Sequence, residues 1–347
     1  MSDKIKRIFI DETSVSIGMH PFLRYRSFCE RRNGIFTPLE RARLKHSNVE
    51  IFYKHSDSFF QEAFLCRNPS VKPYSGESYD LLISSEGFCS WDILPKISKV
   101  IDEDLNISRE FDKWKNKFKV KSDGFAVVGK NKHIYIHPSA TIYPGVVLDT
   151  TDGPIIIDKD VKITSFSFLE GPVYIAPNSS IDNARITGGT IIGNTCKIGG
   201  EVENSIFENF SNKHHEGFVG HSHIGCWVNF GALATTSDLK NNYGMIRLKV
   251  GNESINTETI KFGSIIGDFC KIAIGVMINT GSVIDLGSNV TQSRVKGYLA
   301  PFTWAEGAEK YRLDHFLNDA KKIMARRNKV LTIEEERLLR NLYEVQI

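Results

Sequence analysis

Apolar residues recur at a strict spacing of six in the C-terminal third of the chain. The run consists of Ile266, Ile272, Ile278, Ile284 and Val290, and most residues between them are small or polar. An α-helix repeats every 3.6 residues and a half-buried strand every second residue, so neither produces this period. A period of six is typical of a β-solenoid, in which short strands form flat faces and each coil stacks on the next. The spacing therefore predicts a β-solenoid for the second half of the chain.

The same spacing begins at about Phe125. Gly, Pro, Asn and Asp lie between the repeated positions, where a coil has to turn sharply. The earlier sets are Ile136, Ile142 and Leu148; Ile157 and Ile163; Ile175 and Ile181; and Ile192 and Ile198. The series breaks between about 200 and 262. Because insertions into solenoids often carry the functional site, this segment is where we expect the chemistry.

Different patterns flank the solenoid, which we place at 125–295. Residues 1–115 resemble a small α/β unit with candidate strands at 7–10, 49–53 and 79–83, and residues 116–124 form the predicted linker. A candidate helix at 38–44 has Thr37 as N-cap and Pro38 at its first position. The final segment, 296–347, shows helical spacing and a second helix start at Thr332. We expect its two helices to cover the open end of the last coil.

Composition restricts the function classes. The 347 residues carry a net charge of +3, which gives no electrostatic reason to expect nucleic acid or a membrane as partner. No apolar run is long enough to span a bilayer, and the first residues lack the apolar core of a signal peptide. The six cysteines are scattered and form no C-x-x-C pair, so we expect reduced thiols in a cytoplasmic protein.

Four histidines lie within ten positions of the interrupted segment. The stretch 212–225 reads NKHHEGFVGHSHIG, and 228–232 reads VNFGA. Together they resemble the acetyltransferase half of the bifunctional glucosamine-1-phosphate acetyltransferase / N-acetylglucosamine-1-phosphate uridylyltransferase family. The resemblance covers roughly 125–345 and is closer still to a divergent bacterial branch described as sugar nucleotidyltransferases. It implies a left-handed parallel β-helix of hexapeptide repeats, acetyl-CoA as co-substrate, and a homotrimer with the site between neighbouring helices.

The N-terminal unit resembles a truncated nucleotidyltransferase domain. Its Pro, Arg, Thr and Glu residues between Pro21 and Arg41 fall where the divergent branch has a similar pattern. The Gly-rich loop that cradles a nucleotide pyrophosphate is absent, because the first strand continues into Asp11, Glu12 and Thr13. We therefore expect nucleotidyl transfer, and with it Mg²⁺, to be lost.

Transfer of an acetyl group to an amine requires a base and a donor for the developing oxyanion. The resemblance places His215 as the base and the N–H of Ala232 as the oxyanion donor. Glu216, His221 or His223 could orient the imidazole, and the sequence does not choose among them. The remaining expected contacts come from the same resemblance. Expected to bind substrate are Phe218, Asn229, Lys240, Asn242 and Tyr243, and expected to bind the phosphates of coenzyme A are Arg326 and Arg327.

Two positions depart from the family pattern. Phe218 replaces a substrate-contacting Tyr and lacks its hydroxyl, and Glu203 replaces a Lys that grips phosphate. A sugar 1-phosphate is dianionic and needs cationic partners. Lys213, Lys240, Arg247 or Lys249 could substitute; otherwise the acceptor is a different sugar.

Each candidate also has a structural interpretation. The histidines and asparagines could form hydrogen bonds to backbone groups in loops. Arg326 and Arg327 could simply lie on the solvent-exposed face of a helix. Arg26, Arg31 and Arg32 could be vestigial phosphate contacts or ordinary surface charge, and we expect surface charge. A zinc site like that of γ-type carbonic anhydrases would need a third His about two coils before the cluster, and none lies there. We expect no metal.

The sequence therefore favours an acetyl-CoA-dependent acyltransferase that acts on a sugar phosphate or nucleotide sugar. A sugar-1-phosphate nucleotidyltransferase and a non-catalytic sugar-nucleotide-binding scaffold are the alternatives. Acyl transfer, pyrophosphate-dependent turnover and binding without turnover would distinguish the three.

Overall fold

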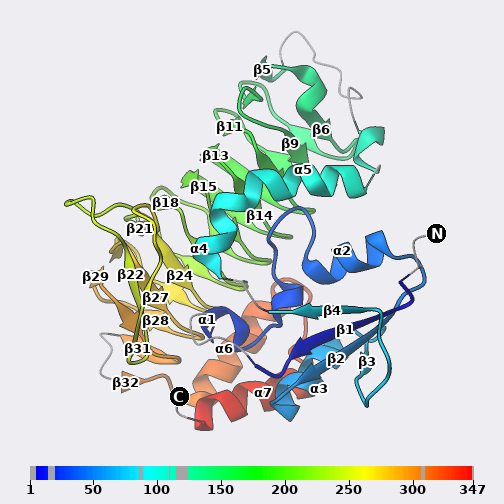
Figure 1. Cartoon of the computed structure of the whole chain (residues 1–347). Helices are drawn as coiled ribbons and strands as arrows, with labels where there is room; N and C mark the ends of the chain where they lie inside the picture. The colour runs from blue at the N-terminus through cyan, green and yellow to red at the C-terminus, as the bar shows by residue number, and fades with distance from the viewer. Residues whose placement is uncertain are drawn as a thin grey trace.

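The computed structural model describes residues 5–14, 20–85, 89–108, 110–114, 124–305 and 309–345. Most of the predicted linker lies outside these residues. Parallel strands from β5 (Ala126–Val128) to β31 (Thr303–Ala305) stack into a β-helix with three faces, and an α/β unit lies against one of its sides (Figure 1). The predicted fold class, an α/β unit followed by a β-helix and a helical C-terminal segment, is confirmed.

The first face, face one, is a nine-stranded parallel sheet. It consists of β6 (Ile134–Ile136), β9 (Ile155–Ile157), β12 (Val173–Ile175), β14 (Thr190–Ile192), β16 (Ile206–Phe207), β19 (His223–Ile224), β24 (Ser264–Ile266), β27 (Ser282–Ile284) and β30 (Tyr298–Leu299).

Faces two and three are joined where β13 (Ser180–Thr187) and β15 (Lys197–Glu203) run around the corner between them. Face two continues with β7 (Thr141–Ile142), β10 (Lys162–Ile163), β17 (Asn212–Lys213), β20 (Asn229–Phe230), β25 (Lys271–Ile272), β28 (Asn289–Val290) and β31. Face three continues with β5, β8 (Val147–Asp149), β11 (Phe168–Glu170), β18 (Phe218–Gly220), β21 (Thr235–Thr236), β26 (Met277–Ile278) and β29 (Arg294–Val295).

The six-residue spacing marks the inward-facing positions. The five residues of the run from Ile266 to Val290 are at most 2% exposed, and they belong to one hydrophobic cluster inside the β-helix. Equivalent positions pair in register between coils, as Ile163, Ile181 and Ile198 do. Each coil therefore buries the inner edge of its neighbour, as the spacing predicts.

The predicted break in the coils is too long. Regular coils continue through β21, and only residues 237–262 form an insertion. Lys213 and Thr236 occupy inward positions that are isoleucine on neighbouring coils, which hides the repeat in the sequence. The insertion contains an antiparallel hairpin, β22 (Arg247–Val250) and β23 (Glu253–Asn256), which packs beside β27 and β30.

The N-terminal unit contains a four-stranded parallel sheet in the order β3-β2-β1-β4. Such an order is shared with doubly wound nucleotide-binding folds, although four strands make only part of one. The predicted strands and the Thr37-capped helix are confirmed, and Thr37 and Glu40 form a capping box. The elements are β1 (Arg7–Glu12), α1 (His20–Leu23), α2 (Pro38–Lys45), β2 (Glu50–His55), α3 (Ser58–Arg67), β3 (Lys72–Pro73), β4 (Leu81–Ser84), α4 (Ser90–Ile93) and α5 (Ile97–Ile107).

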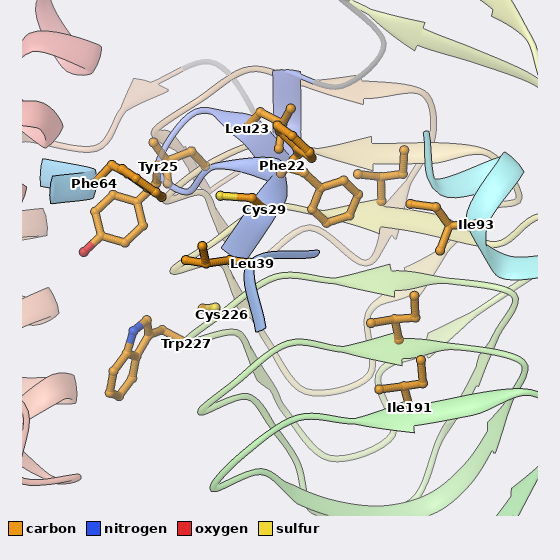
Figure 2. Packing of buried hydrophobic residues seen from close by; sticks show 14 of the residues in the cluster. Phe22, Leu23, Tyr25, Cys29, Leu39, Phe64, Ile93, Ile191, Cys226 and Trp227 are labelled. Carbon is orange, nitrogen blue, oxygen red and sulfur yellow. The ribbon is translucent and has the colours of Figure 1, made fainter. Parts of the chain in front are cut away.

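The N-terminal unit covers the outer side of face one. The middle residues of the face-one strands point outward, yet Ile156 and Ile191 are fully buried. They share a hydrophobic cluster with Phe22, Ile93 and Ile97 from the N-terminal unit, part of which Figure 2 shows. Face one is therefore apolar on both sides and lies between two cores.

Arg31 and Arg32 are buried and Arg26 is partly buried, which corrects the expectation of surface charge for these three residues. Arg31 is fully buried, and its two terminal nitrogens lie 2.9 and 2.6 Å from the carboxylate oxygens of Asp268. The Arg24 Nε lies 2.9 Å from Asp285, and the backbone N–H of Arg32 donates to Glu208. These contacts join the N-terminal unit to the corners beside face one.

The two C-terminal helices, α6 (Leu313–Ala325) and α7 (Ile333–Glu344), do not simply cover the last coil. In α6, Phe316 packs against Phe269 and Phe302 at the edge of the β-helix. α7 packs on α3, and Tyr25 donates to Glu335 at its start. The helices therefore connect the β-helix to the N-terminal unit. Among the described residues, no helix is both long and apolar enough to cross a bilayer.

Candidate active site

His215 lies on the turn between faces two and three. This turn, residues 214–217, stacks directly on the turn 231–234 of the next coil, where the N–H of Leu233 donates to the carbonyl of Glu216 at 2.8 Å. The turn 273–275 follows, because the N–H of Gly275 donates to the carbonyl of Ala232. We call this stack of three turns the His215 corner. His215 and Glu216 are exposed on it.

Glycines allow the coils to stack this closely. A Cβ at Gly199 would lie 2.0 Å from the carbonyl oxygen of His214. A Cβ at Gly217 would lie 2.2 Å from the carbonyl oxygen of Ala234. Gly217 also has a φ of +131°, which favours glycine. The backbone at His215 is therefore held from both neighbouring coils.

Ala232 lies at the His215 corner on the coil next to His215. Its carbonyl accepts from Gly275, but within the described part of the chain its N–H has no hydrogen-bond acceptor. The side chains beside it are apolar and exposed: Leu233 is 64% and Ile274 77% exposed. The corner therefore offers a free backbone donor next to an exposed imidazole.

A second histidine at this corner has a carboxylate beside it. The Nδ1 of His214 lies 3.2 Å from an oxygen of Asp182, which occupies the same corner on an earlier coil. The rings of His214 and His215 are in edge contact, with centroids 5.1 Å apart. Asp182 is a neighbour that the sequence spacing did not reveal.

Lys213 points into the β-helix. It is 1% exposed, and its Nζ donates to the carbonyls of Gly199 at 2.6 Å and of His215 at 2.9 Å. Burial lowers the pKa of Lys213 to about 8, although the negative charges of Glu216 and Glu201 act to raise it. Lys213 therefore cannot hold a substrate phosphate, contrary to one sequence-based alternative. Its ammonium group instead ties the backbone of His215 to the preceding coil.

The lowered pKa of Lys213 predicts how stability depends on pH. Between pH 8 and its ordinary value of 10.5, the unfolded chain binds a proton that the folded chain has lost. The free energy of unfolding should therefore rise over this window, by roughly 3 kcal/mol from this group. Lys213→Met should lack the rise. Urea unfolding of both proteins at pH 7 and pH 10 checks this. An equal change in the free energy of unfolding with pH in the two proteins would contradict it.

His221 does not lie beside His215. It follows β18 at the corner between faces three and one, so the two histidines are at opposite ends of that strand. Its Nδ1 lies 2.7 Å from Asp238, with the side chains 12% and 14% exposed. The hydrogen bond from His221 lowers the pKa of Asp238. Within one chain, His221 cannot orient His215.

His223 is also remote from the His215 corner. It lies on face one, fully buried beneath the N-terminal unit. Its Nδ1 lies 3.1 Å from Ser90 Oγ and its Nε2 lies 3.2 Å from Glu208. Burial lowers the pKa of His223. The residue therefore belongs to the contact between the two units, which corrects the supporting role expected for it.

Two depressions lie on either side of the His215 corner and divide the other predicted residues between them. The face-three groove, about 660 Å³, contains Lys240 and Asn242 together with Arg294 and Lys296, which the sequence did not single out. The face-two pocket, about 300 Å³, contains Asn229. Its full lining is Phe210, Asn212, Trp227, Val228, Asn229, Lys271, Ile323, Arg326 and Arg327.

Three of the residues expected to bind substrate have the following surroundings. Lys240 donates to the carbonyl of Met245, within its own loop. Tyr243 is 69% exposed and lines neither depression. The ring of Phe218 lies over Gly220, near Asp238. Among the residues that the structure describes, no three His, Cys, Asp or Glu side chains are placed to hold a metal ion.

Fold and site together define a β-helix protein with an α/β unit docked on one face and a histidine at a coil corner. Over two fifths to about half of its length, it is similar in sequence to the GlmU proteins. The bifunctional protein GlmU of Thermodesulfovibrio yellowstonii is 29% identical over 190 residues, which is 48% of this chain and 39% of the relative. That of Wigglesworthia glossinidia brevipalpis is 28% identical over 160 residues, 41% of this chain and 32% of the relative. The chain thus spans about a third to two fifths of the length of these relatives.

No protein-family model matches the chain. Among solved structures, a putative acetyltransferase from Bacillus cereus aligns with 64% of this chain and 99% of its own, at 14% identity and a TM-score of 0.28. A histidine-to-alanine mutant of GDP-perosamine N-acetyl transferase from Caulobacter crescentus, in complex with CoA and GDP-perosamine, aligns with 85% of this chain and 92% of its own. Its identity is 14% and its TM-score 0.16. Neither score is high enough to support an argument about function.

Proposed function

We propose that the chain is an acetyl-CoA-dependent acyltransferase whose acceptor is an amino sugar carried as a sugar phosphate or nucleotide sugar. The observation that carries the proposal is the His215 corner, where an exposed imidazole and the free N–H of Ala232 lie on adjacent coils. The relationship to GlmU, a bifunctional protein, supports it.

The two groups supply what direct acyl transfer requires. His215 takes a proton from the acceptor amine as the nitrogen attacks the thioester carbonyl. The N–H of Ala232 donates to the oxygen that becomes negative in the tetrahedral intermediate. As the intermediate collapses, the carbon–sulfur bond breaks, and the imidazolium returns its proton to the departing thiolate. No covalent acyl-enzyme is needed.

The two depressions suggest where the substrates bind. The face-two pocket contains Asn229, and the face-three groove contains Lys240 and Asn242, so the predicted acceptor contacts lie on both faces that meet at the His215 corner. The acceptor contacts predicted for Asn229, Asn242, Tyr243, Lys240 and Phe218 belong to this proposal. A homotrimer, also proposed, would bring a neighbouring chain to the exposed Leu233 and Ile274.

Nucleotidyl transfer is the alternative activity. The parallel order β3-β2-β1-β4 favours it, because that order occurs in nucleotide-binding folds. The absence of a glycine-rich loop after the first strand argues against it. Incubation of a UDP- or dTDP-sugar with pyrophosphate and Mg²⁺ should therefore give no nucleoside triphosphate.

A thiol-release assay tests the proposed activity. The chain is incubated with acetyl-CoA and a panel of amino sugars, their 1-phosphates and nucleotide amino sugars, with His215→Ala as control. We expect acceptor-dependent release of CoA thiol, lost in the variant. Saturable binding of a sugar nucleotide without any thiol release would instead favour a scaffold or sensor.

A further inference from the structure

The face-two pocket contains an unusual number of cations. Three of its lining side chains, Lys271, Arg326 and Arg327, are positive, and none is acidic. Lys271 comes from face two, whereas the two arginines follow the last turn of α6. The β-helix and the C-terminal helix therefore each contribute charge to one cavity of about 300 Å³.

Among the described residues, Arg326 and Arg327 have no ion-pair partner. Lys271 lies 3.1 Å from Asp319 and 3.1 Å from the Tyr311 hydroxyl, so its charge is partly compensated. Within the described part of the chain, no carboxylate forms an ion pair with Arg326 or Arg327. Guanidinium groups prefer carboxylate or phosphate oxygens, which they bind in pairs of hydrogen bonds.

Neutral donors in the same lining are also unused. The amide nitrogen of Asn212 donates to the side-chain oxygen of Asn229, which leaves the amide nitrogen of Asn229 free to donate. Trp227 is 2% exposed, and no acceptor lies within reach of its indole N–H in the described residues. A buried donor without an acceptor is costly, so such groups usually meet water or a ligand.

Stacking of a nucleotide base is not available in this pocket. One face of Trp227 stacks on Phe210 at 4.1 Å, and Phe269 lies parallel to it at 6.3 Å. The ammonium of Lys329 lies 5.9 Å from the Phe210 ring centre. The aromatic residues therefore form one packed side of the pocket, and recognition of a ligand must rely on the cationic and amide side chains.

We propose that the face-two pocket binds the phosphate of the acceptor, with Arg326 and Arg327 as the principal contacts and Lys271 and Asn229 as supporting donors. The inference rests on the proposed function and reassigns the two arginines from coenzyme A to the acceptor. The position where relatives would hold phosphate is Glu203 here, and it pairs with Lys261 at 3.4 Å on face three. A dianion is therefore repelled there and attracted to face two.

The pocket is close enough to the His215 corner for one ligand to reach both. Asn212 and Asn229 lie three residues before His215 and Ala232 along their coils, and because the chain turns in between, their backbones are at most about 10 Å apart. That length is comparable to a phosphorylated hexose. A phosphate in the pocket would thus place the sugar along face two, towards the imidazole.

Direct binding measurements test this assignment without requiring turnover. Inorganic pyrophosphate, glucosamine 1-phosphate, UDP-glucosamine, coenzyme A and pantetheine are titrated calorimetrically into the full chain and into Arg326→Ser/Arg327→Ser. The matched control is Lys322→Ser/Arg337→Ser, which removes two exposed charges outside the pocket. We expect the first double variant to bind at least one of the first three ligands about tenfold or more weakly, with coenzyme A unchanged.

Three results would overturn the assignment. One is loss of coenzyme A affinity alone, which would assign Arg326 and Arg327 to binding of coenzyme A. Another is an equal loss in the control variant, which would show only a general charge effect. The third is no phosphate binding to the unmodified chain. If phosphate binding is lost as expected but no acceptor is ever acetylated, the phosphate site stands and the proposed acyl transfer fails.

Discussion

Replacing His215 with alanine should lower kcat for acyl transfer about 100-fold to 10,000-fold, with little change in the KM for acetyl-CoA. The imidazole is exposed at the corner and makes no hydrogen bond to another described residue, so its removal should not disturb the fold. A base that acts only as the amine attacks contributes to the transition state and not to ground-state binding. Thiol release at saturating acetyl-CoA measures the effect.

His214→Ala is the matched control for this prediction. His214 occupies the same corner and has a neighbouring carboxylate, Asp182, so it is the competing candidate for the base. If His215 is the base, His214→Ala should retain most of the activity. Unchanged turnover in His215→Ala would contradict the mechanism, and a matching collapse in His214→Ala would assign the proton transfer to the His214 and Asp182 pair.

The six-residue period predicted the β-helix because it reports inward-facing positions directly. It failed between about 200 and 236, where the coils continue. Lys213 stands at an inward position that is Ile198 on the preceding coil, and a pattern of apolar residues cannot register a buried lysine. Only the register of the strands shows that its ammonium is satisfied by two carbonyls.

The candidate site was predictable only through the family resemblance, which singled out His215 and Ala232. The structure brings them to one corner because residues at equal offsets on adjacent coils stack. His221 and His223 are near in sequence, but His221 lies at the next corner and His223 lies on face one. Because the chain changes direction at every corner, residues close in sequence are separated in space.

The sequence contains a separate signal for docking of the N-terminal unit, in outward-facing positions that the period of six does not report. The first three strands of face one, β6, β9 and β12, carry apolar or aromatic residues at all three positions, whereas a face exposed to water needs polar residues at the middle position. Ile156 therefore predicts a cover over face one. The identity of the cover, and the buried arginines within it, could not be read from spacing because the partners are far apart in the sequence, as Arg31 and Asp268 are at 237 residues.

Arg31→Ala should lower the free energy of unfolding by about 3–5 kcal/mol. The change leaves the Asp268 carboxylate buried without its cation, and it also removes the donor to the carbonyl of Phe22. Asp268 cannot turn to water, because it is 1% exposed. Chemical denaturation at pH 7 measures the loss.

Two further variants separate the ion pair from simple loss of a side chain. Arg7→Ala breaks an exposed pair with Glu50 and should cost less than about 1 kcal/mol. Arg31→Met/Asp268→Asn removes both charges and should recover much of the stability lost in Arg31→Ala, since no unpaired ion remains. Hydrogen exchange in Arg31→Ala should rise first in face one and α1, where the two units meet. A loss as small as that of Arg7→Ala would mean that apolar packing around Phe22 and Ile191 holds the units together without the ion pair.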